Sequence, residues 1–149
     1  MATQRNNPYG AFNFLVSLGE GDENNVIAGF SDVSGIGTEI NFSEYRNGND
    51  LVNTVRKIAN TFKQEDVTLK RGLIGSTDLF NWVKNVREGA DGRRTVTITV
   101  LDEARNAVAA FKLTNAQPKK WVGPTLAAKG GGEVAMEELH IAHEGVTYE

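Results

Sequence analysis

The chain has 149 residues, of which 40% are hydrophobic and 23% charged, and its net charge at pH 7 is −3. These values are typical of one folded domain spanning residues 1–149, and they exclude an intrinsically disordered chain. The absence of cysteine excludes disulfides, thiolate catalysis and cysteine-ligated zinc. The slight excess of acidic over basic residues disfavours a nucleic-acid-binding surface.

Neither a secretory leader nor a membrane anchor is visible. Residues Met1–Arg5 contain no apolar stretch of the kind that directs export. No run approaches the roughly 20 apolar residues that span a bilayer. We therefore expect synthesis and assembly in the cytoplasm without a signal peptide.

The N-terminal third alternates between apolar and polar residues, which predicts β-strands. Phe12–Leu18 forms one strongly apolar face. Val26–Phe30 is a shorter candidate strand that ends before two closely spaced glycines. Ile36–Phe42 then alternates again. Each pattern is typical of a strand with one buried face.

The segment Ser43–Gln64 breaks this alternation. It begins with a polar, turn-prone run, and Asn47-Gly48 is a strong tight-turn signal. The sequence is compatible with a protruding hairpin or with a long loop. Long loops without structure are uncommon in compact domains and usually have a function, often binding.

The stretch after a strand at Val67–Arg71 predicts a helix. Apolar residues at positions i, i+3, i+4 and i+7 form one stripe, which predicts a helix over about Thr77–Glu88 that flanks the sheet. We expect the stripe to anchor this helix in the core through Leu79, Trp82, Val83 and Val86.

The ends of this helix also carry recognisable signals. Ser76 or Thr77 can cap the N-terminus, and Asp78 suits the positive end of the helix dipole. Gly89 can close the C-terminus.

The C-terminal part returns to strands. Thr95–Val100 is rich in β-branched residues, and a short polar run joins it to Ala107–Leu113 as a hairpin. A final strand is predicted over Val134–Ala142, after the flexible glycines 130–132. The expected fold is mainly β, a sandwich or barrel-like domain with one flanking α-helix.

No arrangement of residues predicts catalysis. His140 and His143 would point to opposite faces of a strand and are therefore poor metal ligands. Gly72–Thr77 resembles a phosphate loop but lacks the lysine before the hydroxyl residue. Asp102-Glu103 lies in a predicted turn. We expect no enzyme, no metal and no cofactor.

The aromatic residues suggest packing. Trp82 belongs to the helix stripe, and Trp121, between Pro118 and Pro124, is expected to pack a loop onto the body. Most of the aromatic residues fit a buried pattern, which disfavours a binding module with clustered exposed aromatics.

A set of short runs, taken in order, covers nearly the whole chain: Phe12–Val16, Ala28–Gly35, Glu44–Arg46, Leu69–Gly72, Gly75–Trp82, Leu101–Glu103, Thr114–Pro124, Glu133–Glu137 and Ile141–Gly145. Together these runs resemble the tube proteins of contractile phage tails and related contractile injection systems. Family members often carry a Pro-Gly turn before the Leu-Lys-Arg-Gly strand, where this chain has Ile58–Phe62, so the shape of the preceding loop can differ.

The resemblance implies a structural subunit that forms a homo-hexamer, lends strands to an inter-subunit β-barrel and stacks into a tube. It implies a surrounding sheath, baseplate, spike and cap proteins, and cargo in the lumen, either protein effectors or DNA, within a phage tail or a phage tail-like particle. No sequence-specific nucleic-acid binding is implied. The candidate contacts between subunits or stacked rings are Glu44, Tyr45, Arg46, Asn47, Gly48, Asn49 and Asp50.

Three alternatives remain open. Within the family, a phage tail that passes DNA and an injection device that passes protein are not separated by these residues. Outside it, the chain could be a non-enzymatic β-sandwich module that binds a ligand or partner, or a hydrolase of unfamiliar type. The Hcp proteins of type VI secretion share the architecture but not these motifs.

Overall fold

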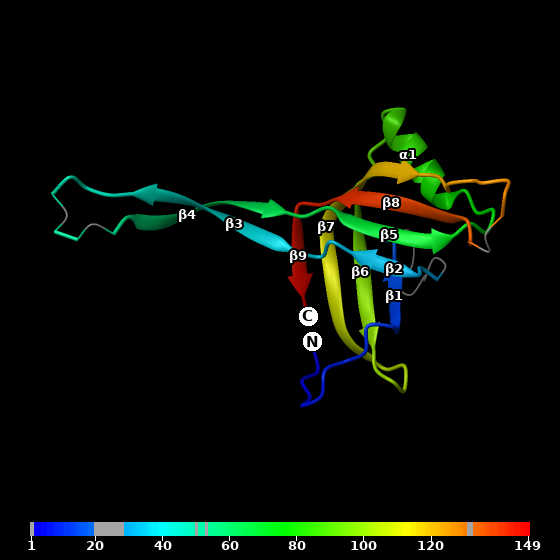
Figure 1. Ribbon diagram of the computed structural model, residues 1–149, viewed down its shortest axis with the longest axis horizontal. Helices are drawn as coiled ribbons and strands as arrows, with labels where there is room; N and C mark the ends of the chain where they lie inside the picture. Colours follow the sequence, from blue (N-terminus) through cyan, green and yellow to red (C-terminus); the bar gives the residue numbers. More distant parts are fainter. Residues whose placement is uncertain (1, 20–28, 50, 53, 131–132) are drawn as a thin grey trace.

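The computed structural model describes residues 2–19, 29–49, 51–52, 54–130 and 133–149. These residues form a mainly β protein with one helix, which confirms the expected fold class (Figure 1). The elements in chain order are β1 (Phe14–Ser17), β2 (Asp32–Ser34), β3 (Thr38–Tyr45), β4 (Arg56–Gln64), β5 (Val67–Gly72), α1 (Asp78–Arg87), β6 (Arg94–Leu101), β7 (Ala107–Val122), β8 (Met136–Ala142) and β9 (Gly145–Tyr148).

Two crossing layers of strands make up the body. One layer contains β1, β6, the first half of β7 and β9, and the other contains the second half of β7, β8, β5 and β2. In Figure 1 the strands of the first layer run vertically and those of the second run horizontally. We call them the vertical layer and the horizontal layer.

The long strand β7 belongs to both layers. It bends at Asn115, whose φ of 49° lies in the left-handed region that asparagine tolerates better than most residues. The Asn115 side chain donates a 2.8 Å hydrogen bond to Glu144, and the Glu144 backbone N–H donates to the carbonyl of Thr114 at 2.9 Å. A bent strand that changes sheets is a common corner of orthogonally packed layers.

The core lies between the two layers and the helix. Strands β5 and β8 alternate strictly between buried and partly exposed residues, which accounts for their clear sequence signal. From α1, Leu79 and Trp82 are buried in this core, while Val83 and Val86 are partly buried against it. The indole N–H of Trp82 donates to the carbonyl of Gly92 at 2.8 Å, so the buried ring keeps its polar group bonded.

The helix ends differ in part from the expectation. Thr77 is the N-cap residue, one of the two positions predicted, but its side chain makes no capping hydrogen bond. Asp78 instead turns toward the sheet and accepts hydrogen bonds from Arg71. At the other end, Gly89 has a φ of 100° and its N–H donates to the carbonyl of Val86 at 3.1 Å.

A buried charged network ties the helix to the horizontal layer. Arg71 on β5 is 1% exposed and pairs with Glu137, its register partner on β8, which is 2% exposed. Arg71 also pairs with Asp78 on α1, and the indole N–H of Trp121 donates to Glu137 at 3.2 Å. Burial alone would raise the pKa of Asp78, but hydrogen bonds from Arg71 and Ser76 outweigh it and hold that pKa below its usual range.

Three expectations for the strands need correction. Trp121 lies in β7 and not in a loop, because Pro118 is accommodated at an irregularity of the β7–β8 register. The last strand is β9, which the sequence did not reveal, and β8 begins two residues later than expected. Most of the predicted strand Val26–Phe30, and Gly131 and Gly132, lie outside the described residues.

Replacing Arg71 with methionine leaves the buried carboxylate of Glu137 without its charge partner, so we expect the free energy of unfolding to fall by about 3–5 kcal/mol. Urea unfolding measures this loss, and the double variant Arg71→Met/Glu137→Met should recover part of it. Lys70→Met is the matched control, since the adjacent pair with Glu138 is partly exposed and contributes about 0–1 kcal/mol. Equal losses for both single variants would contradict this view of the network.

Candidate subunit interface

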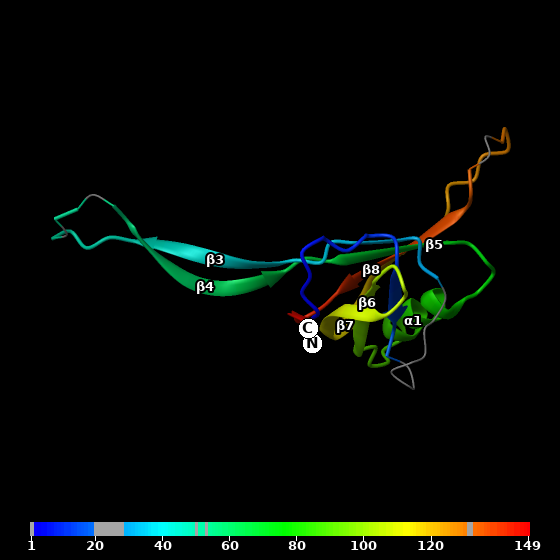
Figure 2. The same cartoon turned by 90° about the horizontal axis from the view of Figure 1, so that it is seen from below.

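Strands β3 and β4 form a two-stranded hairpin that projects far from the body (Figures 1 and 2). We call this hairpin the arm. All residues of β3, and all of β4 except the last, are exposed. The sequence left open whether Ser43–Gln64 forms a protruding hairpin or a long loop. The structure shows a hairpin.

The two faces of the arm differ in chemistry. Ile40 lies opposite Phe62 in the register, and Phe42 lies opposite Ala59. The register shifts between these two pairs, as at a β-bulge, so the four side chains share one face although Ala59 and Phe62 are three residues apart. Phe42 is 57% and Phe62 is 71% exposed. The other face is more polar: Asn41 donates to Thr61, and Asn60 donates to Ser43, at 3.2 and 2.9 Å.

An isolated two-stranded hairpin is marginally stable in water. Large exposed apolar patches on a folded protein mark sites that bind other proteins or membranes. The arm combines both features, because its apolar residues are not among those packed against the core and both of its edges leave backbone groups unpaired by other described strands. It is therefore a candidate surface for binding another protein.

The predicted contact residues lie at the far end of the arm. Glu44 and Tyr45 end β3, and residues 46–49 form the start of the tip, whereas Asp50 lies outside the described residues. The Tyr45 hydroxyl donates to the side-chain oxygen of Asn47, and Arg46 donates to the carbonyl of Val52 at 3.3 Å.

Sequence reasoning missed the apolar part of this tip. Leu51, Val52 and Val55 are all exposed there, next to the polar residues 44–50 that were predicted to make contacts. The weak periodicity of Leu51–Phe62 was the feature of the sequence that could have revealed these apolar side chains. The tip thus presents apolar side chains beside polar ones.

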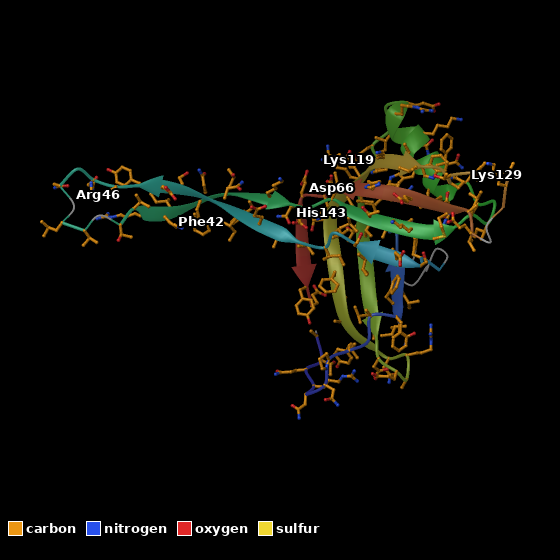
Figure 3. The ribbon with its side chains drawn as sticks, viewed as in Figure 1. Phe42, Arg46, Asp66, Lys119, Lys129 and His143 are labelled. Atoms are coloured by element: carbon orange, nitrogen blue, oxygen red, sulfur yellow. The ribbon has the colours of Figure 1, made fainter. Side chains whose placement is uncertain are left out.

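The root of the arm is held firmly against the body. Gly35 has a φ of 83°, and a Cβ at this position would collide with the carbonyl oxygen of Asp66, so glycine is required. Lys119 pairs with Asp66 at 2.5 Å, and the Nε2 of His143 lies 3.0 Å from the carbonyl of Glu65. Figure 3 labels Asp66, Lys119 and His143 at this root, Phe42 along the arm and Arg46 at its tip.

A second surface feature is an open cleft of about 410 Å³ on the body. It lies between β1 and β2, the two end strands of the sheet path, each of which pairs on one side only among the described strands. The lining includes Asp32 and the apolar residues Phe14, Val33, Ile36, Val100 and Phe111.

The N-terminal segment forms one wall of this cleft through Gly10 and Ala11. Arg5 fastens the segment by two hydrogen bonds to Glu103, at 2.8 and 2.9 Å, in the turn between β6 and β7. These bonds from Arg5 lower the pKa of Glu103 to about 2.

The remaining candidates for chemistry lie apart. His140 contacts Thr68 and Glu138, whereas His143 lies at the arm root. No three histidine, aspartate or glutamate residues within the described ranges could hold a metal ion. Nor does the described part of the chain contain a helix long and apolar enough to cross a membrane.

The expectation that most aromatic residues are buried was wrong. Phe12, Phe42, Tyr45, Phe62, Phe80 and Tyr148 are exposed. Alternation along a strand shows which residues share a face, but it does not show whether the subunit itself covers that face. The aromatic pattern therefore gives no argument against a binding surface.

Comparison with known proteins points to one family. The family model described as "T4-like virus tail tube protein gp19" matches residues 10–147. None of the curated proteins compared with the chain matches it.

Solved structures share the fold. A chain of the sheath–tube complex of PVC, an extracellular contractile injection system, matches with a TM-score of 0.82 at 24% identity, covering 95% of this chain and 91% of that chain. The cap that terminates the tube of the anti-feeding prophage matches with a TM-score of 0.83 at 21% identity, covering 100% and 94%. Hcp1 from Flavobacterium johnsoniae is more distant, with a TM-score of 0.58 at 14% identity over 92% and 94%.

Removing an arm aromatic should leave the isolated subunit as stable as before. We expect Phe62→Ser to change the free energy of unfolding of the monomer by no more than about 0.5 kcal/mol, because the ring is already in water. Leu69→Ala, in the core, should cost about 2–5 kcal/mol in the same urea titration. A large loss for Phe62→Ser would show that the arm packs within its own subunit.

The fastening of the N-terminal segment should weaken in acid. The depressed pKa of Glu103 means that the bond stabilises the folded state fully above pH 4.5 and stops doing so as the pH falls through about 2. Hydrogen exchange of the Thr3 amide, which donates to the carbonyl of Val108, reports the release. Glu103→Gln should show faster exchange already at pH 7, and Asp91→Asn, a matched exposed carboxylate, should not.

Proposed function

Because the chain belongs to the T4-like virus tail tube protein gp19 family and is a structural tube subunit, we propose that six copies close into a ring and that rings stack into a conduit. The main support for this proposal is the arm. Its exposed apolar face and its open edges need another copy to cover them. The 149 residues act as a single tail-tube-like domain.

The horizontal layer supplies the strands for the wall of the conduit. It contains four strands in the order β7, β8, β5 and β2, and both outer strands have an edge free of other described strands. Six such sheets joined at their edges would give a closed barrel of about 24 strands. With strands about 4.8 Å apart and tilted by about 40°, the backbone radius is roughly 20–25 Å. A barrel of this width leaves an open lumen.

The work of such a subunit is mechanical. A closed barrel leaves no sheet edges to pair wrongly, and it stays rigid while cargo, either protein effectors or DNA, passes through the lumen. The subunit carries out no catalysis and needs no cofactor or metal, and it makes no sequence-specific contact with nucleic acid.

The partners and location follow from the same assembly. A sheath surrounds the tube, and baseplate, spike and cap proteins lie at its ends. The similarity to chains of a sheath–tube complex and of a tube-terminating cap supports this arrangement. The subunit is synthesised in the cytoplasm and ends in a phage tail or a phage tail-like particle.

The tip of the arm makes the contacts between stacked rings. Glu44, Tyr45, Arg46, Asn47, Gly48, Asn49 and Asp50, together with the exposed Leu51 and Val52, form this contact surface. The position of the tip at the far end of the arm lets it reach beyond its own subunit (Figure 1).

Deleting residues Asn47–Asp50 should impair stacking and leave the subunit folded. Negative-stain electron microscopy across a concentration series measures the outcome: the intact protein should give rings and tubes with a central hole, and the deletion variant should give single rings. An unchanged melting temperature serves as the control for folding. Tubes of undiminished length from the deletion variant would contradict the role of the tip, and compact monomers of the intact protein at every concentration would contradict the tube.

A further inference from the structure

The cleft between β1 and β2 has an apolar floor that this subunit leaves uncovered. We infer that the cleft receives the apolar face of the arm of a neighbouring copy, with Phe42 and Phe62 entering it. This inference rests on the proposed assembly of identical copies, and it names the surface that the arm meets.

The chemistry of the cleft matches that of the arm. Phe14, Val100 and Phe111 belong to the vertical layer, and Val33 and Ile36 lie at the margin of the horizontal layer, so the cleft opens in the angle where the two layers part. Its volume of about 410 Å³ lies within the roughly 300–1,000 Å³ of typical binding pockets. Aromatic side chains on a hairpin are suitable occupants of such a space.

The occupant has to come from another copy. The arm leaves the body along the long axis of the molecule, and its apolar face lies outside the core cluster (Figure 1). The arm and the cleft are different surfaces, so an arm-to-cleft contact is heterologous. Contacts of this type, repeated by rotation, form a ring when the rotation closes and an open helical filament when it does not.

The charges around the two surfaces do not oppose this contact. Lys57 lies opposite Glu44, so these two side chains balance each other on the face that carries Phe42. Asp32, an exposed residue of β2, lines the cleft.

A competing candidate surface lies at the end of the body farthest from the arm (Figure 1). Leu73, Ile74, Leu126 and Val134 are exposed there, in the strand-to-helix turn and in the loop between β7 and β8. The hollow at that loop is lined in part by Thr125 and Glu133 and contains no aromatic residue among its described lining. The aromatic cleft fits the aromatic arm better, and the experiment below distinguishes the two sites.

Paired cysteines test the contact directly, because the natural chain contains none. Ala59→Cys places a thiol between the arm aromatics, and Ala11→Cys places one on the wall of the cleft; both positions are exposed, so the variants should fold. The matched control combines Ala59→Cys with Ala127→Cys, which lies in the hollow at the loop between β7 and β8. Rings or tubes assembled from each double variant are treated with a short bismaleimide and separated on a denaturing gel.

We expect most of the Ala59→Cys/Ala11→Cys chains to shift to dimers and larger covalent oligomers, and the control pair and each single variant to stay monomeric. Crosslinking only in the control pair, or in neither pair, while electron microscopy shows rings, would overturn the cleft as receptor and leave the tube function standing. Crosslinking in a single variant would indicate a symmetric contact and overturn it too. Absence of rings from the natural chain would overturn both proposals.

Discussion

The buried ion pair between Arg71 and Glu137 links the strands and the helix that position the rest of the structure. It joins the two central strands of the horizontal layer at a position hidden from water, and its second link to Asp78 orients the helix. A buried ion pair of this kind contributes little net stability, because desolvation offsets the attraction, but removing one partner is costly. Since only two residues separate β4 from β5, the network also fixes the strand from which the arm extends.

The arm shows how one subunit can be stable yet incomplete. The body buries a conventional core around Leu69, Leu139 and Trp82. The arm, by contrast, holds its shape through cross-strand hydrogen bonds and a braced root, with apolar groups such as Phe62 left in water. The hydrophobic free energy that those groups could contribute is therefore not used within the subunit.

The sequence predicted the parts of the fold whose periodicity reflects burial within the subunit. The alternation of β5, β6 and β8 and the helical stripe at Leu79 and Trp82 were readable because each element covers one face with its own core. The arm was ambiguous, since apolar residues on an exposed hairpin give the same alternation as core residues when only the sequence is read. Strand β9 was too short to give a signal, and Pro118 concealed the length of β7. The cleft depends on how two layers part in space, which local patterning does not encode.

The bend of β7 at Asn115 gives the body a continuous path for mechanical load. One covalent strand runs through both layers, so a force that pushes one layer away from the other acts along the peptide backbone as well as across hydrogen bonds. The layers cannot be pulled apart while β7 stays paired with β6 and β9 in one layer and with β8 in the other. A part driven lengthwise under compression gains toughness from this continuity, because separation of the layers also requires one side of β7 to lose its ladder.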